Sequence, residues 1–317
     1  MAALTIAGVE ILPGQSRRLE IPVARLPTGT NLSLPVEVVS GERSGPTIWL
    51  SAAVHGDELN GVEIIRQVME KIDASRIAGT VIATPIVNVY GLIDQSRYLP
   101  DGRDLNRCFP GTASGSLASR LAHLFMKEIV RRCKYGIDLH TGANHRTNLP
   151  QIRADLSDDE TRRCAEAFGA PVVIDARTRD GSLRWAATKK TGAKVLLYEA
   201  GEPLRFDEMA ISAGVKGVLR VMAALEMRRL KLKSKPKTLR FDKTSWVRAK
   251  RSGIMLLEVK LGQGVRKGDK LGRVADAFGQ EPQSLTAPGD GVVIGFTNNP
   301  LVHQGDAVVH VGLAASS

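Results

Sequence analysis

Short apolar runs alternate with segments of helical period from the start of this 317-residue chain to about Ala224. Residues 47–54 form one such run, and the segment from Leu59 to Ile72 then repeats apolar side chains every three or four positions. Runs that are apolar at nearly every position are typical of strands buried on both faces of a sheet. The pattern predicts strands at 47–54, 81–87, 137–139, 172–174 and 195–198, and helices at 59–72, 121–130 and 209–230. We therefore expect an α/β fold whose sheet is covered by helices on both faces.

Beyond about residue 240 the chain is rich in Gly and Val and loses the helical period. A four-residue pattern occurs twice there, 37 positions apart, as Val265, Gly268, Asp269 and Val274 and as Val302, Gly305, Asp306 and Val311. Each copy predicts a β segment, a Gly-Asp turn and a second β segment. We therefore expect two similar hairpins in a small all-β sandwich or barrel.

Residues from about 240 to 313 resemble the biotinyl/lipoyl-like barrel, and the turn at 286–293 is part of that resemblance. Carrier domains of this type present a lysine between their two halves. Residues 275–280 hold that position here, and no lysine follows Lys270. We expect this part to shape or cover a site, or to mediate contacts in an oligomer, rather than to carry a group.

The chain carries 44 basic and 33 acidic residues, a formal net charge of +11. Eleven of the basic residues and one acid lie between Arg228 and Arg251, which leaves about +1 for the rest of the chain. Charge repulsion and Pro236 disfavour a continued helix there, so we expect an α/β domain of residues 1–232 and a β domain of residues 233–317. Because the excess charge is local and aromatic residues make up only 4%, we expect no nucleic-acid partner. Binding of nucleic acid by the basic segment is the rival hypothesis, and it predicts affinity that falls steeply with salt.

The cysteines and the start of the chain bear on its compartment. Cys108, Cys133 and Cys164 are odd in number and form no C-x-x-C pair, a pattern that suits a reducing cytoplasm. The segment from Met1 to Gly14 lacks the basic and apolar regions of a signal peptide. No apolar stretch approaches the length of a membrane-spanning helix. We expect a soluble, cytoplasmic protein with no membrane partner.

Two histidines and a glutamate follow predicted strands. His55 and Glu58 lie three positions apart where the chain leaves the strand at 47–54 and enters a helix, so both side chains can point to one spot. His140 follows the strand at 137–139, and ligand sites in open α/β sheets lie beyond the carboxyl ends of strands. H-x-x-E alone is a weak signal. Together with His140 it gives two imidazoles and one carboxylate, a ligand set of catalytic zinc, and predicts a metal site.

Further polar residues occur at positions suited to catalysis or binding. Glu199 ends a predicted strand and is placed either to move protons or as a solvated loop acid. Asn106 and Arg107 lie in the loop at 102–111, whose guanidinium and amide groups suit an anionic substrate. Arg97, just upstream, is placed to stabilise an oxyanion. The alternative for the arginines is surface pairing with acids of the same loop.

Four segments occur in order: H-G-D-E from His55, D-L-N-R from Asp104, D-L-H-T-G from Asp138 and E-A-G-E from Glu199. They resemble the succinylglutamate desuccinylase/aspartoacylase family, relatives of the zinc carboxypeptidases, over about residues 45–225. The resemblance implies a carboxypeptidase-like mixed sheet flanked by helices, and a single zinc held by His55, Glu58 and His140. It implies Glu199 as general base and acid. It further implies that Asn106 and Arg107 bind the substrate carboxylate and that Arg97 or Arg103 polarises the scissile carbonyl.

The C-terminal part is typical of a bacterial branch of this family whose members deacylate N-acyl amino acids. We therefore predict a zinc-dependent amidohydrolase that releases a carboxylic acid from a small N-acylated amino acid, with zinc-bound water as nucleophile. The close alternative is a zinc carboxypeptidase that acts on short peptides. A metal-binding scaffold without catalysis would need neither Glu199 nor the arginine loop. The sequence leaves the acyl group, the amino acid and a homo-oligomeric state open.

Overall fold

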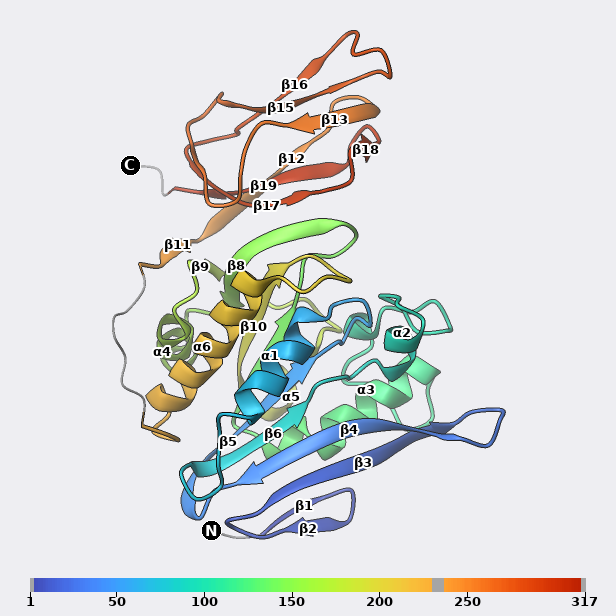
Figure 1. Cartoon of the computed structure of the whole chain (residues 1–317), viewed down its shortest axis with the longest axis vertical. Coiled ribbons are helices and arrows are strands. Elements are labelled where there is room, and N and C mark those ends of the chain that lie inside the picture. Colours follow the sequence, from blue (N-terminus) through green and yellow to red (C-terminus); the bar gives the residue numbers. More distant parts are fainter. Residues whose placement is uncertain (1–2, 230–236, 315–317) are drawn as a thin grey trace.

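The computed structural model describes residues 3–229 and 237–314, and a large mixed sheet runs through it (Figure 1). Four neighbouring central strands are parallel, namely β6 (Ala78–Thr84), β5 (Arg43–Ala52), β7 (Tyr135–His140) and β10 (Lys194–Gly201). Antiparallel strands extend the sheet on both sides, namely β4 (Asn31–Ser40) and β3 (Ser16–Arg25) beyond β6, and β8 (Arg146–Ala154) beyond β10. β9 (Val172–Asp175) runs parallel to β8, and β1 (Leu4–Ile6) and β2 (Val9–Ile11) form a separate hairpin. The predicted α/β fold is confirmed, with a mixed sheet.

Helices cover both faces of the central sheet, as the sequence predicts. One face packs against α1 (Asn60–Met69), α4 (Asp159–Phe168) and α6 (Glu208–Ala224). The other packs against α3 (Leu117–Glu128) and α5 (Leu183–Thr191). Within β5, Ile48 and Leu50 join the first apolar cluster, whereas Trp49 joins the second. Successive side chains of a strand point to opposite faces, so a strand covered on both sides carries apolar side chains on both faces.

Several predicted element ends differ from the structure, and two of them have a clear physical reason. The helix predicted to reach Leu230, a residue outside the described part of the chain, ends at Ala224. Glu226 takes a left-handed φ of 59°, and Met227 is buried, with its carbonyl accepting a hydrogen bond from the Ala78 N–H at 2.7 Å. This tertiary contact ends the helix although the apolar period continues. The strand predicted at 81–87 runs from 78 to 84, because Pro85 has no N–H for the ladder.

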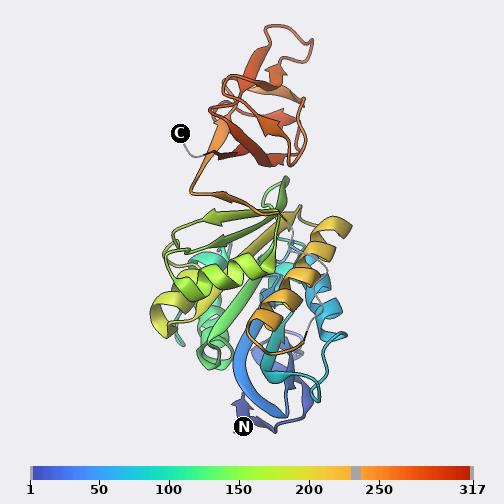
Figure 2. The same cartoon turned by 90° about the vertical axis from the view of Figure 1, so that its left-hand side faces the viewer.

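The described chain after residue 237 is all β, as predicted (Figure 2). One sheet contains β16 (Gln283–Thr286), β15 (Lys270–Ala275), β13 (Gly253–Leu257) and β18 (Leu301–Val302). Opposite it, β12 (Lys243–Arg248), β19 (Ala307–Leu313), β17 (Gly291–Thr297) and β14 (Gly264–Val265) belong to the large sheet. The two sheets enclose an apolar core that includes Leu271, Val274, Val293 and Val309.

The prediction of two hairpins around the Gly-Asp turns is wrong. β14 pairs with β17 and β15 with β13 and β16, so the strands before and after the first turn lie in different sheets. The second turn likewise leads from β18 in one sheet to β19 in the other. The turns themselves do repeat: the Arg266 N–H donates to Asp269, and the His303 N–H to Asp306, both at 2.8 Å. The repeated pattern therefore encodes a turn that carries the chain across the core.

The large sheet continues from the α/β part into the C-terminal β region, which we define as residues 239–313. β17 pairs with β8, with Gly295 opposite Asn148. β11 (Leu239–Phe241) pairs with β9 on the other side of β8. The expected boundary between residues 232 and 233 falls outside the described residues. No helix in the described ranges is both long and apolar enough to cross a membrane.

Candidate active site

Three adjacent parallel strands bring predicted site residues to one edge of the sheet. β7 lies between β5 and β10, and all three run in the same direction. His140 is the last residue of β7, Glu199 of β10 lies beside it in register, and His55 comes shortly after β5. Because the carboxyl ends of parallel strands meet at one edge, the side chains of His55, His140 and Glu199 line a single cavity.

A tight turn connects β5 to His55. Ala53 has a left-handed φ of 46°, and its carbonyl accepts a hydrogen bond from the Asn88 N–H at 2.8 Å. A Cβ on Gly56 would lie 1.9 Å from the carbonyl carbon of Gly91, so only glycine lets the two loops pack this closely. The loop that Gly56 touches begins with α2 (Val89–Ile93) and leads on to Arg97. The glycine of H-G-D-E is thus required by packing.

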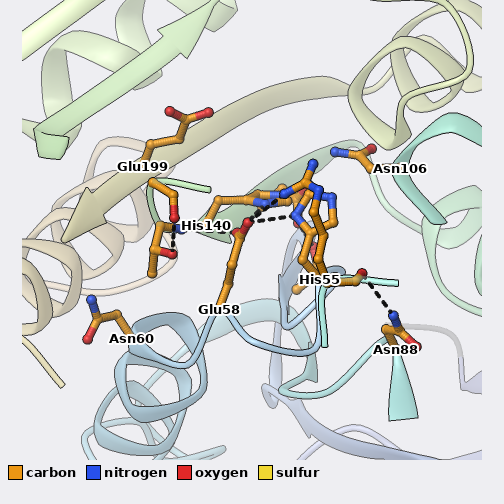
Figure 3. A network of polar contacts seen from close by, with 12 residues as sticks. His55, Glu58, Asn60, Asn88, Asn106, His140 and Glu199 are labelled. Carbon is orange, nitrogen blue, oxygen red and sulfur yellow. Dashed lines mark hydrogen bonds and ion pairs between the residues drawn. The ribbon is translucent and has the colours of Figure 1, made fainter. Parts of the chain in front are cut away.

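Glu58 lies between the two histidines (Figure 3). Its Oε1 is 2.8 Å from His55 Nδ1, and its Oε2 is 2.8 Å from His140 Nδ1. The Thr141 N–H also donates to Oε2, at 3.1 Å. All three side chains are buried, and one ligand atom from each lies within 4.8 Å of the others. Two imidazole nitrogens and a carboxylate so close together form a cluster that can hold a metal ion.

The outer nitrogen of each imidazole faces a carboxylate that the sequence did not single out. His55 Nε2 is 3.1 Å from Asp104 Oδ1, and His140 Nε2 is 2.8 Å from Asp138 Oδ2. The Ser51 hydroxyl donates to the other oxygen of Asp138 at 2.7 Å. A carboxylate at Nε2 favours the tautomer with its proton there, which frees Nδ1 as a metal ligand. Asp138 is two residues before His140 on the same face of β7, so the strand period could have revealed it.

Interactions with neighbouring charges determine the protonation of His55, Glu58 and His140. Burial lowers the pKa of His55, but the charge of Glu58 and the hydrogen bond to Asp104 outweigh it, so the pKa is raised. The same balance, with Asp138 and Glu58 as partners, raises the pKa of His140 well above its usual value. Burial raises the pKa of Glu58, yet the two histidines hold it well below its usual range. Glu58 is therefore a carboxylate at neutral pH, the form that binds a cation.

The structure separates the two arginines considered for the scissile carbonyl. Arg97 donates to Glu58 Oε1 at 3.1 Å and to Asp104 Oδ2 at 2.9 Å, and it lines the cavity. Arg103 instead pairs with Asp101 at 3.2 Å on the surface, with its side chain 54% exposed, and is not part of the cavity lining. Of the two, Arg97 is the one beside the histidine–carboxylate cluster.

Asn106 and Arg107 line the same cavity from a single turn, η1 (Leu105–Arg107). Asp104 begins this turn and accepts a hydrogen bond from the Asn106 N–H at 2.8 Å. The Asn106 Oδ1 accepts a hydrogen bond from the Leu183 N–H at 2.8 Å. This contact identifies which amide atom is the oxygen, so the other atom is Nδ2, a hydrogen-bond donor. The Arg107 guanidinium lies 3.9 Å from Asp104. Two neighbouring donor side chains at a cavity wall suit a carboxylate ligand.

Glu199 lies beside the cluster without belonging to it (Figure 3). Its Oε2 accepts from Asn148 Nδ2 at 2.9 Å and lies 3.4 Å from Arg153 Nε. A Cβ on Gly295, opposite Asn148 in the C-terminal β region, would lie 2.6 Å from the Asn148 Oδ1. The glycine therefore leaves space for Asn148 to reach Glu199. The sequence pointed to neither Asn148 nor Arg153, since only the pairing of β8 with β10 brings them here.

The cavity that these residues line is strongly basic and has a volume of about 330 Å³. Its lining includes seven arginines: Arg97, Arg107, Arg146, Arg153, Arg177, Arg179 and Arg184. Three acids line it as well, Glu58, Asp138 and Glu199, and the first two hold the histidines. Trp246 of β12 completes the lining, so the C-terminal β region contributes a side chain to the site. A small cavity with this charge suits an anionic ligand.

The other histidines do not join the cluster. His145, the nearest to it in sequence, lines a different hollow with Asp57 and Glu202, and its carbonyl accepts from the Asn298 N–H at 2.7 Å. His310 is buried in β19, as a packed histidine. Among the described residues, the group that could hold a metal ion consists of His55, Glu58 and His140.

A family model described as the succinylglutamate desuccinylase/aspartoacylase catalytic domain matches residues 44–225, more than half of the chain. The chain belongs to the succinylglutamate desuccinylase/aspartoacylase family. This family comprises hydrolytic deacylases that act on small acyl amino acids. The sequence resemblance is thus confirmed over the α/β part.

Individual relatives match over nearly the whole chain. The N-alpha-acetyl-L-2,4-diaminobutyric acid deacetylase of Halomonas elongata is 28% identical over 298 residues, 90% of this chain and 86% of that protein. A succinylglutamate desuccinylase/aspartoacylase crystal structure from Rhodobacter sphaeroides has a TM-score of 0.84 and 27% identity, covering 96% of each chain. The product-bound ectoine utilization protein EutE (DoeB) from Ruegeria pomeroyi has a TM-score of 0.85 at 23% identity, covering 96% of this chain and 98% of that one. At that identity the last match shows the fold alone.

Proposed function

We propose that this protein is a zinc-dependent amidohydrolase that removes the acyl group from an N-acylated amino acid, with one zinc per subunit. The observation that carries the proposal is the buried cluster of His55, Glu58 and His140 with a separate carboxylate, Glu199, beside it in register. Membership of a deacylase family and the deacetylase relative support the same reaction class.

The donor set fits zinc. Both histidines direct Nδ1 towards Glu58, and the opposite nitrogen of each ring faces a carboxylate. Such outer carboxylates raise the basicity of imidazole ligands and fix their orientation. Three protein ligands leave a coordination position for a small molecule, the arrangement of catalytic rather than structural zinc. When bound, the metal supplies a Lewis acid that polarises a carbonyl and lowers the pKa of water.

The surrounding residues bind the substrate, stabilise developing charge and transfer protons. Asn106 and Arg107 bind the carboxylate of the amino acid, because they present neighbouring donors at the cavity wall. Arg97, at 3.1 Å from Glu58, is placed to stabilise the negative charge that develops on the scissile carbonyl oxygen. Glu199 takes a proton from water and delivers it to the leaving nitrogen. Asn148 holds the Glu199 carboxylate in place at 2.9 Å.

The cavity favours a small substrate over a peptide. Its volume of about 330 Å³ lies at the lower end of ligand pockets, which span about 300–1,000 Å³. Trp246 from the C-terminal β region forms part of its wall. We propose that residues 1–232 form the catalytic domain and that residues 233–317 form a lipoyl-like accessory domain that limits the cavity. A carboxypeptidase acting on short peptides would need space that this wall occupies.

The decisive experiment measures hydrolysis of N-acetyl and N-succinyl amino acids and of short peptides by the zinc-loaded full chain. We expect turnover of acyl amino acids, loss of activity on chelation and recovery with zinc. Glu199→Gln should lower kcat by about 10²- to 10⁴-fold and retain zinc. Glu202→Gln is the matched control, since that carboxylate pairs with Arg205 at 2.7 Å outside the cavity and should change kcat little.

Three results would count against the proposal. Unchanged kcat in Glu199→Gln would remove Glu199 from proton transfer. Faster turnover of peptides than of acyl amino acids would favour the carboxypeptidase. A chain without hydrolase activity that binds an oligonucleotide at about 50 mM salt, and releases it as salt rises, would favour the nucleic-acid hypothesis.

A further inference from the structure

Asn60 carries a buried amide at the start of α1, and its side chain connects three elements of the α/β part. It is only 1% exposed and is the first residue of the helix. Its Nδ2 donates a hydrogen bond to the carbonyl of Ala200 in β10 at 3.2 Å. Its Oδ1 accepts one from the N–H of Asp207, the residue that caps α6, at 2.9 Å. Both ends of the amide are therefore used, and the two contacts identify which atom is the nitrogen.

These contacts join the two chain segments that carry Glu58 and Glu199. Asn60 follows Glu58 by two residues, and Ala200 follows Glu199 by one. Figure 3 shows Asn60 and Glu199 on the same side of Glu58. As far as the described residues define the cavity, its lining does not include Asn60. The amide therefore links the segment of a metal-ligand candidate to the strand of the proposed proton carrier, and it lies outside the space for substrate.

The bond to Ala200 falls where the pairing of β10 is irregular. The register with β8 shifts between Glu199 and Gly201, so that two residues of β8 face Ala200 alone. A bulge of this kind redirects side chains and is common beside active sites. The Gly142 N–H donates to the Gly201 carbonyl at 3.0 Å and ties this end of β10 to the chain that follows β7. Asn60 supplies the corresponding tie to α1.

Gly201 provides the space that this tie requires. It has a left-handed φ of 69°. A Cβ at this position would lie 2.6 Å from the Asn60 Nδ2 and 3.2 Å from the Asp207 Cβ, so a larger residue would displace the amide. The glycine of E-A-G-E therefore serves the contact with Asn60. The segments that begin with H-G-D-E and E-A-G-E thus meet at one buried hydrogen bond.

Placement of Glu199 matters because proton transfer requires hydrogen-bond distances. Asn148 holds the side chain of Glu199, donating to its Oε2 at 2.9 Å. Asn60 instead restrains the backbone one residue further along the strand. A misplacement of about 1 Å at a reacting group can lower the rate by about 10²-fold. Both amides are therefore needed to hold the carboxylate in a productive place.

We propose that Asn60 is a positioning residue, which holds the end of β10 against α1 and thereby sets the place of the Glu199 carboxylate relative to the metal-ligand cluster. It acts through Glu199 and does not itself contact the substrate. The inference rests on the proposed function, in which Glu199 moves protons between water and the leaving nitrogen. A role in stability alone would predict a less stable chain with an unchanged kcat.

Asn60→Asp tests the contact with little change in shape. One aspartate oxygen can still accept from the Asp207 N–H, whereas the other replaces the donor that faces the Ala200 carbonyl. In the zinc-loaded full chain we expect kcat to fall by about 10- to 100-fold. KM should stay within about threefold and zinc should be retained, since Asn106, Arg107 and the ligands stay in place. The substrate is the N-acetyl or N-succinyl amino acid that the unaltered chain hydrolyses fastest.

Asp158→Ala is the matched control for a loss of stability. Asp158 caps α4 by accepting a hydrogen bond from the Thr161 N–H at 2.8 Å. It also pairs with Lys194, the first residue of β10, at the opposite end of that strand from Glu199. Loss of this helix cap should lower the midpoint of urea unfolding and leave kcat within about twofold.

A second mutation tests whether Asn60 acts through Glu199. A chain with Glu199→Gln has no carboxylate left to position, so adding Asn60→Asp should change kcat by less than about twofold. Gly201→Ala is an independent variant, because it leaves residue 60 unaltered and places a Cβ against its Nδ2. It should lower kcat with zinc retained, and this loss should also disappear when Glu199 is replaced by Gln.

Crystal structures of the zinc-loaded unaltered chain and of Asn60→Asp give a readout that needs no turnover. We expect the Glu199 carboxylate to shift by about 1 Å or more relative to Glu58 and His140, which should stay in place. A carboxylate that does not move would overturn the inference.

The kinetic outcomes separate this inference from the proposed function. Unchanged kcat in Asn60→Asp, loss of zinc, or an equal loss of kcat with and without the Glu199 carboxylate would overturn the positioning role. If neither Asn60→Asp nor Gly201→Ala folds by circular dichroism, the contact is a requirement of the fold, and the positioning role is likewise overturned. If the unaltered chain hydrolyses no acyl amino acid, the proposed function fails, and the two crystal structures still decide whether Asn60 sets the place of Glu199.

Discussion

Replacing Asp138 by asparagine changes the chemistry behind His140 while it preserves the shape of the side chain. In the structure one carboxylate oxygen of Asp138 lies 2.8 Å from His140 Nε2, and the other accepts the Ser51 hydroxyl at 2.7 Å. Asp138 is 1% exposed, so water does not compete for these contacts. The carboxylate keeps the proton of His140 on Nε2 and leaves Nδ1, which faces Glu58, free for a metal.

An asparagine cannot satisfy both neighbours equally well. If its NH₂ group faces His140, Nε2 must accept, and the ring proton moves to Nδ1, where it blocks metal binding. If its oxygen faces His140, the NH₂ group faces Ser51, whose hydroxyl must then accept instead of donate. Loss of such an outer partner typically weakens metal binding by about 10- to 100-fold, or about 1.4–2.7 kcal/mol. We expect Asp138→Asn to weaken zinc binding within that range.

Zinc affinity is measured at pH 7 by competition with a chromophoric chelator, with circular dichroism to verify the fold. Ser51→Ala is the matched control, because it removes the second neighbour and leaves the carboxylate at His140. Its effect should be clearly smaller than that of Asp138→Asn. Unchanged zinc affinity in Asp138→Asn, or an equal loss in both variants, would refute the role of the carboxylate in holding the tautomer.

Three further changes test other parts of the site and fold. Gly295→Ala adds a Cβ 2.6 Å from the Asn148 Oδ1 and should lower kcat by about tenfold or more with zinc retained, whereas the Cβ of Gly264→Ala meets nothing within 4 Å and should leave kcat unchanged. His140→Ala should strip the metal, and full zinc occupancy by elemental analysis would contradict its assignment as a ligand. The pKa of His310 is about 3 in the folded chain, so the unfolded chain takes up the proton first and stability falls as the pH drops below about 6.5. His310→Phe should therefore lose about 2 kcal/mol less stability than the unaltered chain between pH 7 and pH 5 in urea unfolding, and equal losses would contradict this.

The fold of the α/β part was largely predictable because its signals are local. The run at 47–54 is apolar at six of its eight positions, and a strand needs such a run only when both of its faces are covered. The ends of helices and strands were harder to predict from the sequence. The last helix stops at Ala224 because Met227 turns inward to meet Ala78, a partner far away along the chain.

The repeated Gly-Asp pattern shows a similar limit. Its turns were recognisable, since glycine and aspartate favour a tight reversal, and the hydrogen bonds to Asp269 and Asp306 repeat. The strands on either side of each turn pair with other strands, and no local sequence pattern predicts which ones. Turn chemistry is encoded within the turn itself, whereas strand pairing depends on the whole core.

By itself the sequence determined which side chains end the central strands. His55, His140 and Glu199 each follow an apolar run, and parallel strands necessarily bring their carboxyl ends to one edge. Only the tertiary structure decided which of two nearby arginines faces that edge. It also decided that Asn148 reaches the edge from β8, which pairs with β17 across the junction, and that Trp246 reaches it from β12 of the C-terminal β region. The physical reason is that the hydrophobic period and the spacing of residues determine only where a side chain points on its own helix or strand. Contacts between distant elements depend instead on register and on space, such as the space that Gly295 leaves beside Asn148.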